Sequence, residues 1–271
     1  MSSTASAERT SVGWGPAILR SLACLSAFAL VYGAAVLTPL GQRVDTGLMG
    51  GGFHPLPRPV ELLQLVRKGS PIILAVVGTV SAIGALRRRQ WGLVLRCAAL
   101  CCISFAAARL MRWWLPRPDF GDLTYPANTW PSGHVAASAA LVVAALALAP
   151  PNWQTLTVRR VGALVLLATA SASIATLAHR PSDVIASMLL VAGLTAVLFP
   201  AGVVGWRALR RDVVPALASA LAAVCFSLVP WFREFALLVN GAWMVAAVLL
   251  TIGWRGAAPA TAVQGVGRSD R

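Results

Sequence analysis

Long apolar runs recur along almost the whole chain, and they constrain the fold more than any other feature of the sequence. A helix needs about 20 apolar residues to cross the hydrocarbon core of a bilayer. Backbone groups in lipid must be hydrogen-bonded internally, which favours helices. Such runs lie near residues 16–39, 70–86, 91–112, 133–149, 161–179, 183–206, 213–230 and 235–253. The sequence therefore predicts an all-α, polytopic transmembrane bundle of about eight spans.

The composition agrees with lipid as the solvent of this chain. Hydrophobic residues make up 58% of its 271 residues and charged residues only 12%, whereas soluble domains carry about 25% charged residues. The net charge of +14 would suggest nucleic acid in a soluble protein. Here the basic residues form short clusters between apolar runs, as in loops that contact anionic headgroups. We therefore expect a lipid bilayer, and no nucleic acid, as a partner.

Neither a metal nor another cofactor is predicted. The five cysteines lie within apolar runs, without the paired spacing and neighbouring histidines of a zinc site. We interpret them as small core residues of membrane helices. Arginine, alanine and valine abound while Lys68 is the single lysine, a bias typical of GC-rich bacterial genomes. The predicted location is a bacterial plasma membrane.

The arginines between the apolar runs predict the orientation of the chain. With both termini in the cytoplasm, the inner connections hold its compact basic clusters, as the positive-inside rule requires. These clusters are Arg87 to Arg89, Arg159 and Arg160, Arg207 to Arg211, and Arg255. The connections at 40–69, 112–134 and 179–183 then face outside. The first run could instead be a cleaved signal peptide, which would leave the later connections where they are.

No repeat or linker divides the chain. Residues 14–254 are predicted to form one membrane domain between two cytoplasmic tails, 1–13 and 255–271, which are polar or rich in small residues.

The outer connection from His179 to Asp183 carries the first candidate chemistry. Pro181 suits the first turn of a helix, which would also contain Asp183. The carboxylate could then bond to one ring nitrogen of His179 and leave the other nitrogen as a nucleophile. The same residues could also serve only as a helix cap and headgroup anchor.

The other polar connection supplies groups that bind anions. Ser132 can cap the next helix, and Gly133 allows a ligand to approach the backbone at a helix N-terminus, which is an anion site. His134 could act as a general acid. Arg117, between two prolines, could donate two hydrogen bonds to phosphate. Singly, these residues could be an ordinary helix start and an interfacial arginine, but together on one face they indicate phosphate chemistry.

In this order the motifs resemble the signature of the type-2 phosphatidic acid phosphatase family. Its three blocks are matched by Arg117-Pro118, by Pro131-Ser132-Gly133-His134, and by His179 with Asp183 four residues later. The resemblance covers about residues 85–205. It implies a six-helix catalytic core, to which the runs within 213–253 would add a C-terminal hairpin.

The resemblance also implies roles for single residues. His179 would form a phosphohistidine, Asp183 would orient it, and His134 would protonate the leaving group. The phosphoryl oxygens would be held by Arg117, Ser132 and the Gly133 amide. The family requires no metal.

Two cations of the family signature are absent from this chain. Leu110 stands where the family has a lysine, and Ser173 stands where it has an arginine. We expect Arg180 to replace the arginine, and either Arg109 or Arg112 to replace the lysine.

The expected function is metal-independent hydrolysis of a phosphomonoester or diphosphate on a membrane lipid at the extracytoplasmic face. Polyprenyl diphosphate, phosphatidic acid and phosphatidylglycerol phosphate all fit. One alternative is a lipid-linked phosphotransferase that uses the same site. The other is a non-catalytic lipid-phosphate binder or transporter, which the serine at position 173 would favour.

Overall fold

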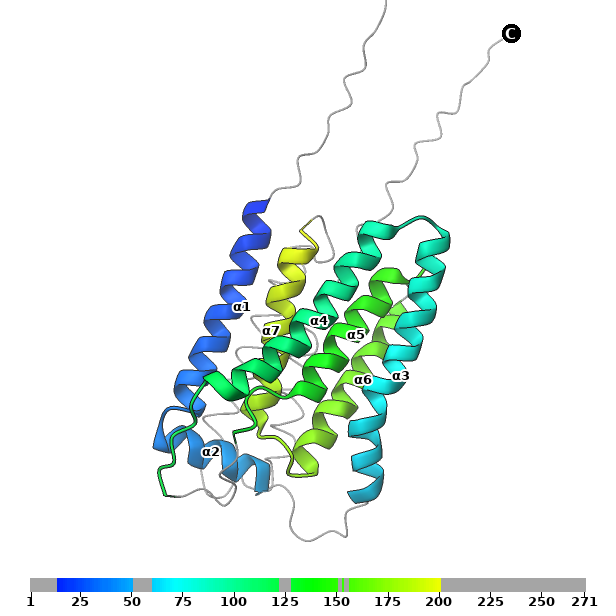
Figure 1. The fold of residues 1–271 in the computed structure, drawn as a ribbon. Helices are drawn as coiled ribbons and strands as arrows, with labels where there is room; N and C mark the ends of the chain where they lie inside the picture. Colours follow the sequence, from blue (N-terminus) through cyan, green and yellow to red (C-terminus); the bar gives the residue numbers. More distant parts are fainter. Residues whose placement is uncertain (1–13, 51–59, 122–127, 151–152, 154–155, 201–271) are drawn as a thin grey trace, which may run out of the picture.

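A computed structural model describes residues 14–50, 60–121, 128–150, 153 and 156–200, and within these ranges the regular structure is entirely helical (Figure 1). The helices are α1 (Trp14–Ala35), α2 (Pro39–Gly50), α3 (Val60–Arg87), α4 (Trp91–Trp114), α5 (Gly133–Leu148), α6 (Leu156–Ala175) and α7 (Pro181–Leu198). The predicted all-α class is confirmed for the part of the chain that the structure describes.

Four of these helices are long and apolar enough to cross a membrane, namely α1, α3, α4 and α7. The apolar parts of α5 and α6 are shorter, at Gly133–Leu148 and Val161–Ala175. The outer surfaces of α1, α3 and α4 expose large apolar side chains such as Leu30, Ile72 and Leu95, as lipid-facing helices do. The predicted hairpin at 213–253 lies outside the described residues.

The predicted outer connection at 40–69 is wrong in part. Residues Pro39–Gly50 form α2, and α3 begins at Val60, ten residues before the expected start of its apolar run. Arg67 and Lys68 interrupt that run in the sequence. Long basic side chains can extend along a helix to its polar end, so they do not terminate it.

The helices run up and down the bundle, so the polar connections gather at one end. In Figure 1, α3, α5 and α7 begin at the lower end, where α2 and the segment after α4 also lie. The prediction that the two polar connections share one face agrees with this arrangement. We call this lower end, which carries α2, residues 115–121 and 128–132, and residues 176–183, the polar end.

Helix α5 lies in the centre and packs against α3, α4, α6 and α7. Small residues on α5, among them Ala136, Ala139 and Ala140, are fully buried, and they allow neighbouring helices to approach closely. A β-carbon at Gly162 of α6 would lie 3.0 Å from the Val142 side chain of α5, so a larger residue here would displace that side chain by a few tenths of an ångström. The close packing fixes the start of α5 relative to the other helices.

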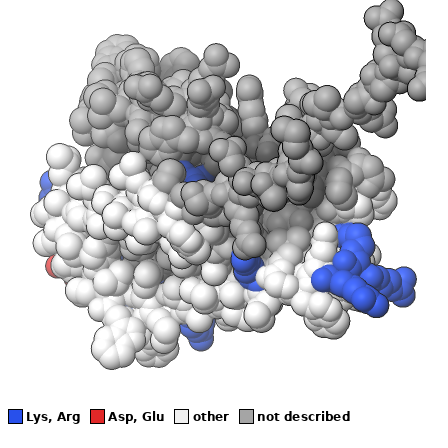
Figure 2. Space-filling model, turned by 90° about the horizontal axis from the view of Figure 1, so that it is seen from above, with Lys and Arg blue, Asp and Glu red and all other residues white. Residues whose placement is uncertain are grey.

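The opposite end of the bundle is basic. Arg87, Arg88 and Arg89 are exposed in the turn between α3 and α4. Figure 2 views the molecule from this end and shows Lys and Arg side chains gathered at one edge. The two ends therefore differ in chemistry, with a basic turn at one and the polar connections at the other.

Candidate phosphate site

His179 lies in the short connection between α6 and α7, beside the first turn of α7. Its side chain is 5% exposed, and its Nδ1 atom lies 3.7 Å from Oδ2 of Asp183. This separation is an ion-pair distance and is longer than a hydrogen bond. The carboxylate faces one ring nitrogen, so the other nitrogen, Nε2, is the one that can act on a ligand.

The end of α6 determines where His179 lies. Leu177 has a left-handed backbone, with φ of 54°. Its N–H donates to the carbonyl of Ile174 and that of Ala178 donates to the carbonyl of Ser173, at 2.8 and 3.2 Å. This is the Schellman ending of a helix. The carbonyl of Ser173 also accepts from the N–H of His179, at 3.2 Å.

Ser173 therefore has a structural task in this chain. Its hydroxyl donates to the carbonyl of Thr169 in the same helix, at 2.7 Å, and the residue is fully buried. Where the family signature has an arginine, this chain has a residue whose backbone holds the connection that carries His179.

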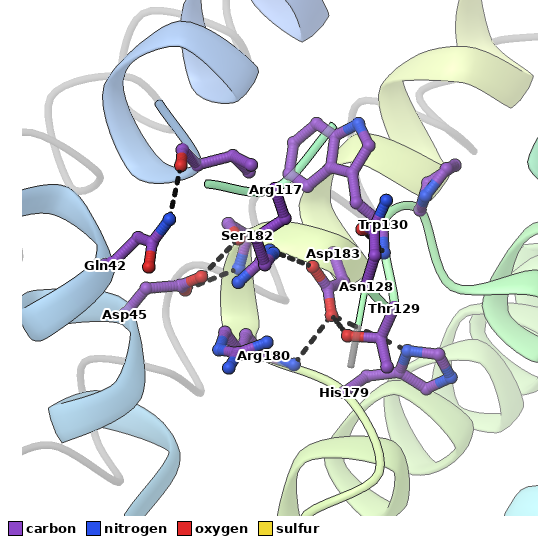
Figure 3. A network of polar contacts seen from close by, with 12 residues as sticks. Gln42, Asp45, Arg117, Asn128, Thr129, Trp130, His179, Arg180, Ser182 and Asp183 are labelled. Carbon is purple, nitrogen blue, oxygen red and sulfur yellow. Dashed lines mark hydrogen bonds and ion pairs between the residues drawn. The ribbon is translucent and has the colours of Figure 1, made fainter. Parts of the chain in front are cut away.

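The carboxylate of Asp183 is the centre of the site, and Figure 3 shows the groups around it. Its Oδ1 accepts from Nη2 of Arg117 at 3.0 Å. Its Oδ2 accepts from the hydroxyl of Thr129 and from the backbone N–H of Arg180, the latter at 3.0 Å. A buried carboxylate needs such partners to remain charged. Asp183 thus joins three segments of the polar end.

Arg117 supplies donors that the described part of the protein does not use. Its side chain is fully buried, and Nη2 binds Asp183. Nε and Nη1 are also buried, and neither has a hydrogen-bond partner among the described residues. Buried guanidinium donors without acceptors are costly. An oxyanion is the kind of group that would accept hydrogen bonds from these donors.

Ser132 and Gly133 form the start of α5, as the sequence predicted. Ser132 is the N-cap, and its hydroxyl accepts from the N–H of Val135 at 3.5 Å. Its own N–H donates to the backbone carbonyl of Asp183 at 3.1 Å. Ser187 bridges the same two segments by donating to the carbonyls of Ser132 and Asp183, at 2.9 and 2.7 Å. The N-terminus of α5 is therefore held against the first turn of α7.

His134, the second residue of α5, is half-buried at this N-terminus. The side chains that lie close enough to exert an electrostatic effect on it are Arg67, Lys68, Arg112 and His179. The structure thus brings the two predicted histidines together, with basic residues of α3 and α4 beside one of them.

The three predicted replacement cations are placed differently from one another. Arg112 donates from Nε and Nη2 to the carbonyl of Pro131, both at 3.2 Å, beside the start of α5. Arg180 is fully buried, but its Nε donates to Thr46 of α2 at 3.4 Å, and its side chain extends toward α2 (Figure 3). Arg109 is exposed on α4 and has no hydrogen bond or ion pair to the described residues. Of the three, Arg112 alone lies beside His134.

Helix α2 contributes residues that sequence reasoning missed. Asp45 accepts from the backbone N–H of Ser182 at 3.0 Å and from its hydroxyl. Gln42 donates to the carbonyls of Val36 and Pro118, at 2.6 and 2.9 Å. The buried residues of α2, Gln42, Asp45 and Met49, share one helical face. This spacing was the signal available in the sequence.

Burial gives Asp45 unusual acid–base properties. It raises the pKa of Asp45 from 3.8 to about 7, and the nearby negative charge of Asp183 acts in the same direction. The hydrogen bonds from Ser182 and the charge of Arg117 oppose this increase. Asp45 therefore changes its charge near neutral pH, beside the carboxylate that binds Arg117.

Thr129 and Trp130 were also without a predicted role. The hydroxyl of Thr129 binds Asp183. Trp130 is fully buried, and its ring packs against Phe28 and Tyr32 of α1, with centroids 5.4 and 5.6 Å apart. Trp130 thus anchors the segment before α5 to α1.

Within the described ranges, no group of three or more His, Cys, Asp or Glu side chains is placed to hold a metal ion. Comparisons of the chain with family models, curated proteins and solved structures found no match. The function of the site is therefore inferred from its own geometry and from the sequence motifs.

Proposed function

We propose that this protein is a lipid-phosphate phosphatase of the type-2 phosphatidic acid phosphatase kind. It would hydrolyse a phosphomonoester or diphosphate on a membrane lipid through a phosphohistidine at His179, without a metal. The observation that carries the proposal is the buried cluster of His179, Asp183 and Arg117. Two guanidinium nitrogens of Arg117 there have no acceptor among the described residues. A phosphoryl group would supply these acceptors.

The contacts support a role for each residue in the first step. Asp183 faces Nδ1 of His179, which leaves the lone pair of Nε2 to attack phosphorus. Arg117 and the N-terminus of α5 would stabilise the charge that spreads over the phosphoryl oxygens. As the bond from phosphorus to the leaving oxygen breaks, its electrons go to that oxygen, and His134 would donate a proton to it.

The second step would restore the enzyme. Water attacks the phosphorus of the phosphohistidine, and the bond to Nε2 breaks as its electrons return to the ring of His179. His134, now neutral, takes the proton from the water. The products are inorganic phosphate and the dephosphorylated lipid.

We also propose that the polar end faces outward from a bacterial plasma membrane. The support is the basic turn from Arg87 to Arg89 at the opposite end of the bundle. Compact basic clusters next to membrane spans remain on the cytoplasmic side. The substrate would then be a lipid of the outer leaflet.

Phosphate release by purified protein tests the proposal. Protein in nonionic detergent micelles is given phosphatidic acid, phosphatidylglycerol phosphate or a polyprenyl diphosphate, with a chelator and no acceptor. We expect inorganic phosphate to be released, vanadate to inhibit, and His179→Ala to reduce turnover to background. Arg96→Gln, an exposed arginine of α4 toward the basic end, is the control and should retain activity.

Two further results distinguish the rival functions. Phosphate release that appears only with an added acceptor would indicate a phosphotransferase. Binding of lipid phosphate without turnover would indicate a binder or transporter. Hydrolysis that persists without His179, or that requires a divalent metal, would show the proposed mechanism to be wrong.

A further inference from the structure

The basic residues beside His134 are not explained by hydrolysis of a simple phosphomonoester. They come from two helices, Arg67 and Lys68 from α3 and Arg112 from α4. In the proposed reaction, His134 lies on the side of the leaving group. The alcohol that leaves a phosphomonoester needs one proton, not three neighbouring cations.

The position of Arg67 follows from the packing of α3 on α5. The two helices run in the same direction (Figure 1), and a β-carbon at Gly78 would lie 3.8 Å from Leu141. Toward the polar end, Arg67 lies eleven residues before Gly78 on α3. His134 lies seven residues before Leu141 on α5. At about 1.5 Å per residue, their Cα atoms differ in height by about 6 Å. An extended arginine side chain covers that difference.

Arg67 also lies on the correct face of α3. The buried residues of this helix include Ser70, Leu74 and Gly78. Arg67 precedes them at helical spacing, so it belongs to the face that packs on α5. Its Nε is buried and has no hydrogen-bond partner among the described residues. Arg67 thus presents an unused buried donor on the side of α3 that faces the start of α5.

No ion pair joins Arg67 or Lys68 to any of the four carboxylates that the structure describes, which are Asp45, Glu61, Asp119 and Asp183. Asp183 is bound by Arg117, Thr129 and the Arg180 backbone. Asp45 binds Ser182. Neither Arg67 nor Lys68 forms an ion pair with a described residue, and adjacent cations repel one another. This part of the site is therefore complementary to an anion.

From this juxtaposition we infer that the substrate is a lipid diphosphate, whose inner phosphate binds Arg67, with Lys68 and Arg112 beside it. The inference rests on the proposed function. His179 would attack the terminal phosphorus, and the bond from that phosphorus to the bridging oxygen would break. The electron pair would remain on the bridging oxygen, which leaves as part of a lipid monophosphate. The three cations stabilise the negative charge that develops there.

The test compares a diphosphate and a monophosphate on the same lipid tail. Purified protein is assayed in nonionic detergent micelles without anionic lipid, and kcat/KM is measured from phosphate release. We expect wild type to prefer the diphosphate at least tenfold, and Arg67→Gln to reduce that preference about tenfold, as loss of one charge-assisted hydrogen bond would. Arg67→Lys should retain part of the preference. Arg96→Gln should leave it unchanged.

The outcomes separate the inference from the proposed function. Equal kcat/KM for both lipids, with hydrolysis still dependent on His179, overturns the inference and leaves the proposed function intact. A preference that appears only with added anionic lipid would mean that the membrane surface, and not Arg67, selects the diphosphate, and also overturns it. No hydrolysis of either lipid overturns both. If Arg67→Gln does not fold, the ratio of kcat/KM for the diphosphate to that for the monophosphate in wild type decides whether the inference holds.

Discussion

The carboxylate of Asp45 in α2 accepts two hydrogen bonds from Ser182 in the first turn of α7, one from the backbone N–H and one from the hydroxyl. Ser182 precedes Asp183, which binds Arg117. Asp45 therefore binds the residue that directly precedes the central carboxylate of the site. Because its pKa is raised from 3.8 to about 7, its charge changes in the pH range in which the protein would operate.

The first prediction follows from that pKa. Between pH 3.8 and about 7, folded Asp45 holds a proton that the unfolded chain has released. Its contribution to stability is thus fully present below pH 3.8 and is lost as the pH rises through about 7. Asp45→Asn, which cannot ionise, should melt a few degrees above wild type at pH 8, with a smaller difference at pH 5. Thermal unfolding in detergent at both pH values checks this.

The same ionisation should affect substrate binding. Ionised Asp45 adds a negative charge near Asp183 and Arg117. This charge repels a phosphoryl group, so KM of wild type should rise above pH 7 while KM of Asp45→Asn stays flat. Asp119→Asn, an exposed acid at the same end, is the control. Parallel profiles of KM against pH for wild type and Asp45→Asn would show that the charge of Asp45 does not affect substrate binding.

The second prediction concerns Thr129. Its hydroxyl donates to Asp183, so Thr129→Val removes one hydrogen bond without changing the size of the side chain. Loss of a hydrogen bond to a charged group costs about 1.5–3 kcal/mol, and we expect kcat to fall at least tenfold. Thr169→Val, which removes a hydroxyl bonded within α6, should have little effect on kcat. Equal losses in the two variants would indicate general destabilisation instead of a role in the site.

The local structure of the site could be predicted from sequence because short-range rules determine it. Ser132 before Gly133 and Pro181 before Asp183 identified the starts of α5 and α7, and both helices begin there. The charge pattern also placed both connections at one end of the bundle. The helix starts depend on residues that are close in the sequence, and the shared end depends on the distribution of arginines along the chain.

The contacts of Asp45 and Thr129, which sequence reasoning missed, are long-range. Asp45 and Ser182 are 137 residues apart, and Thr129 and Asp183 are 54 apart. Nothing local marks such pairs, because they depend on how α2 packs against α7. Ser182 belongs to the connection that was predicted to face outside, but it is 4% exposed and hydrogen-bonded to Asp45 of α2. Arg67 was assigned to an outer loop because α3 was expected to start ten residues later.

The third prediction tests how the end of α6 positions His179. Leu177 has φ of 54°, and left-handed backbone costs about 1–2 kcal/mol in residues other than glycine. Leu177 is 40% exposed, so its truncation loses less packing than truncation of a fully buried leucine would. Leu177→Gly should therefore raise the free energy of unfolding by about 1 kcal/mol and leave kcat/KM unchanged. A lower melting temperature for Leu177→Gly would mean that the Leu177 side chain matters more than its backbone strain.

The fourth prediction concerns the orientation of the bundle in the membrane. Ser182 is too buried for labelling, whereas Asp119 is exposed at the polar end and Gln90 is exposed in the turn at the basic end. In a background without the five native cysteines, Asp119→Cys should react with an impermeant thiol reagent added to intact cells. Gln90→Cys should react only after the membrane is opened, because basic connections remain in the cytoplasm. Labelling of Gln90→Cys alone in intact cells would invert the orientation. The substrate would then be a lipid of the inner leaflet, although the chemistry proposed for His179 and Arg117 would be unchanged.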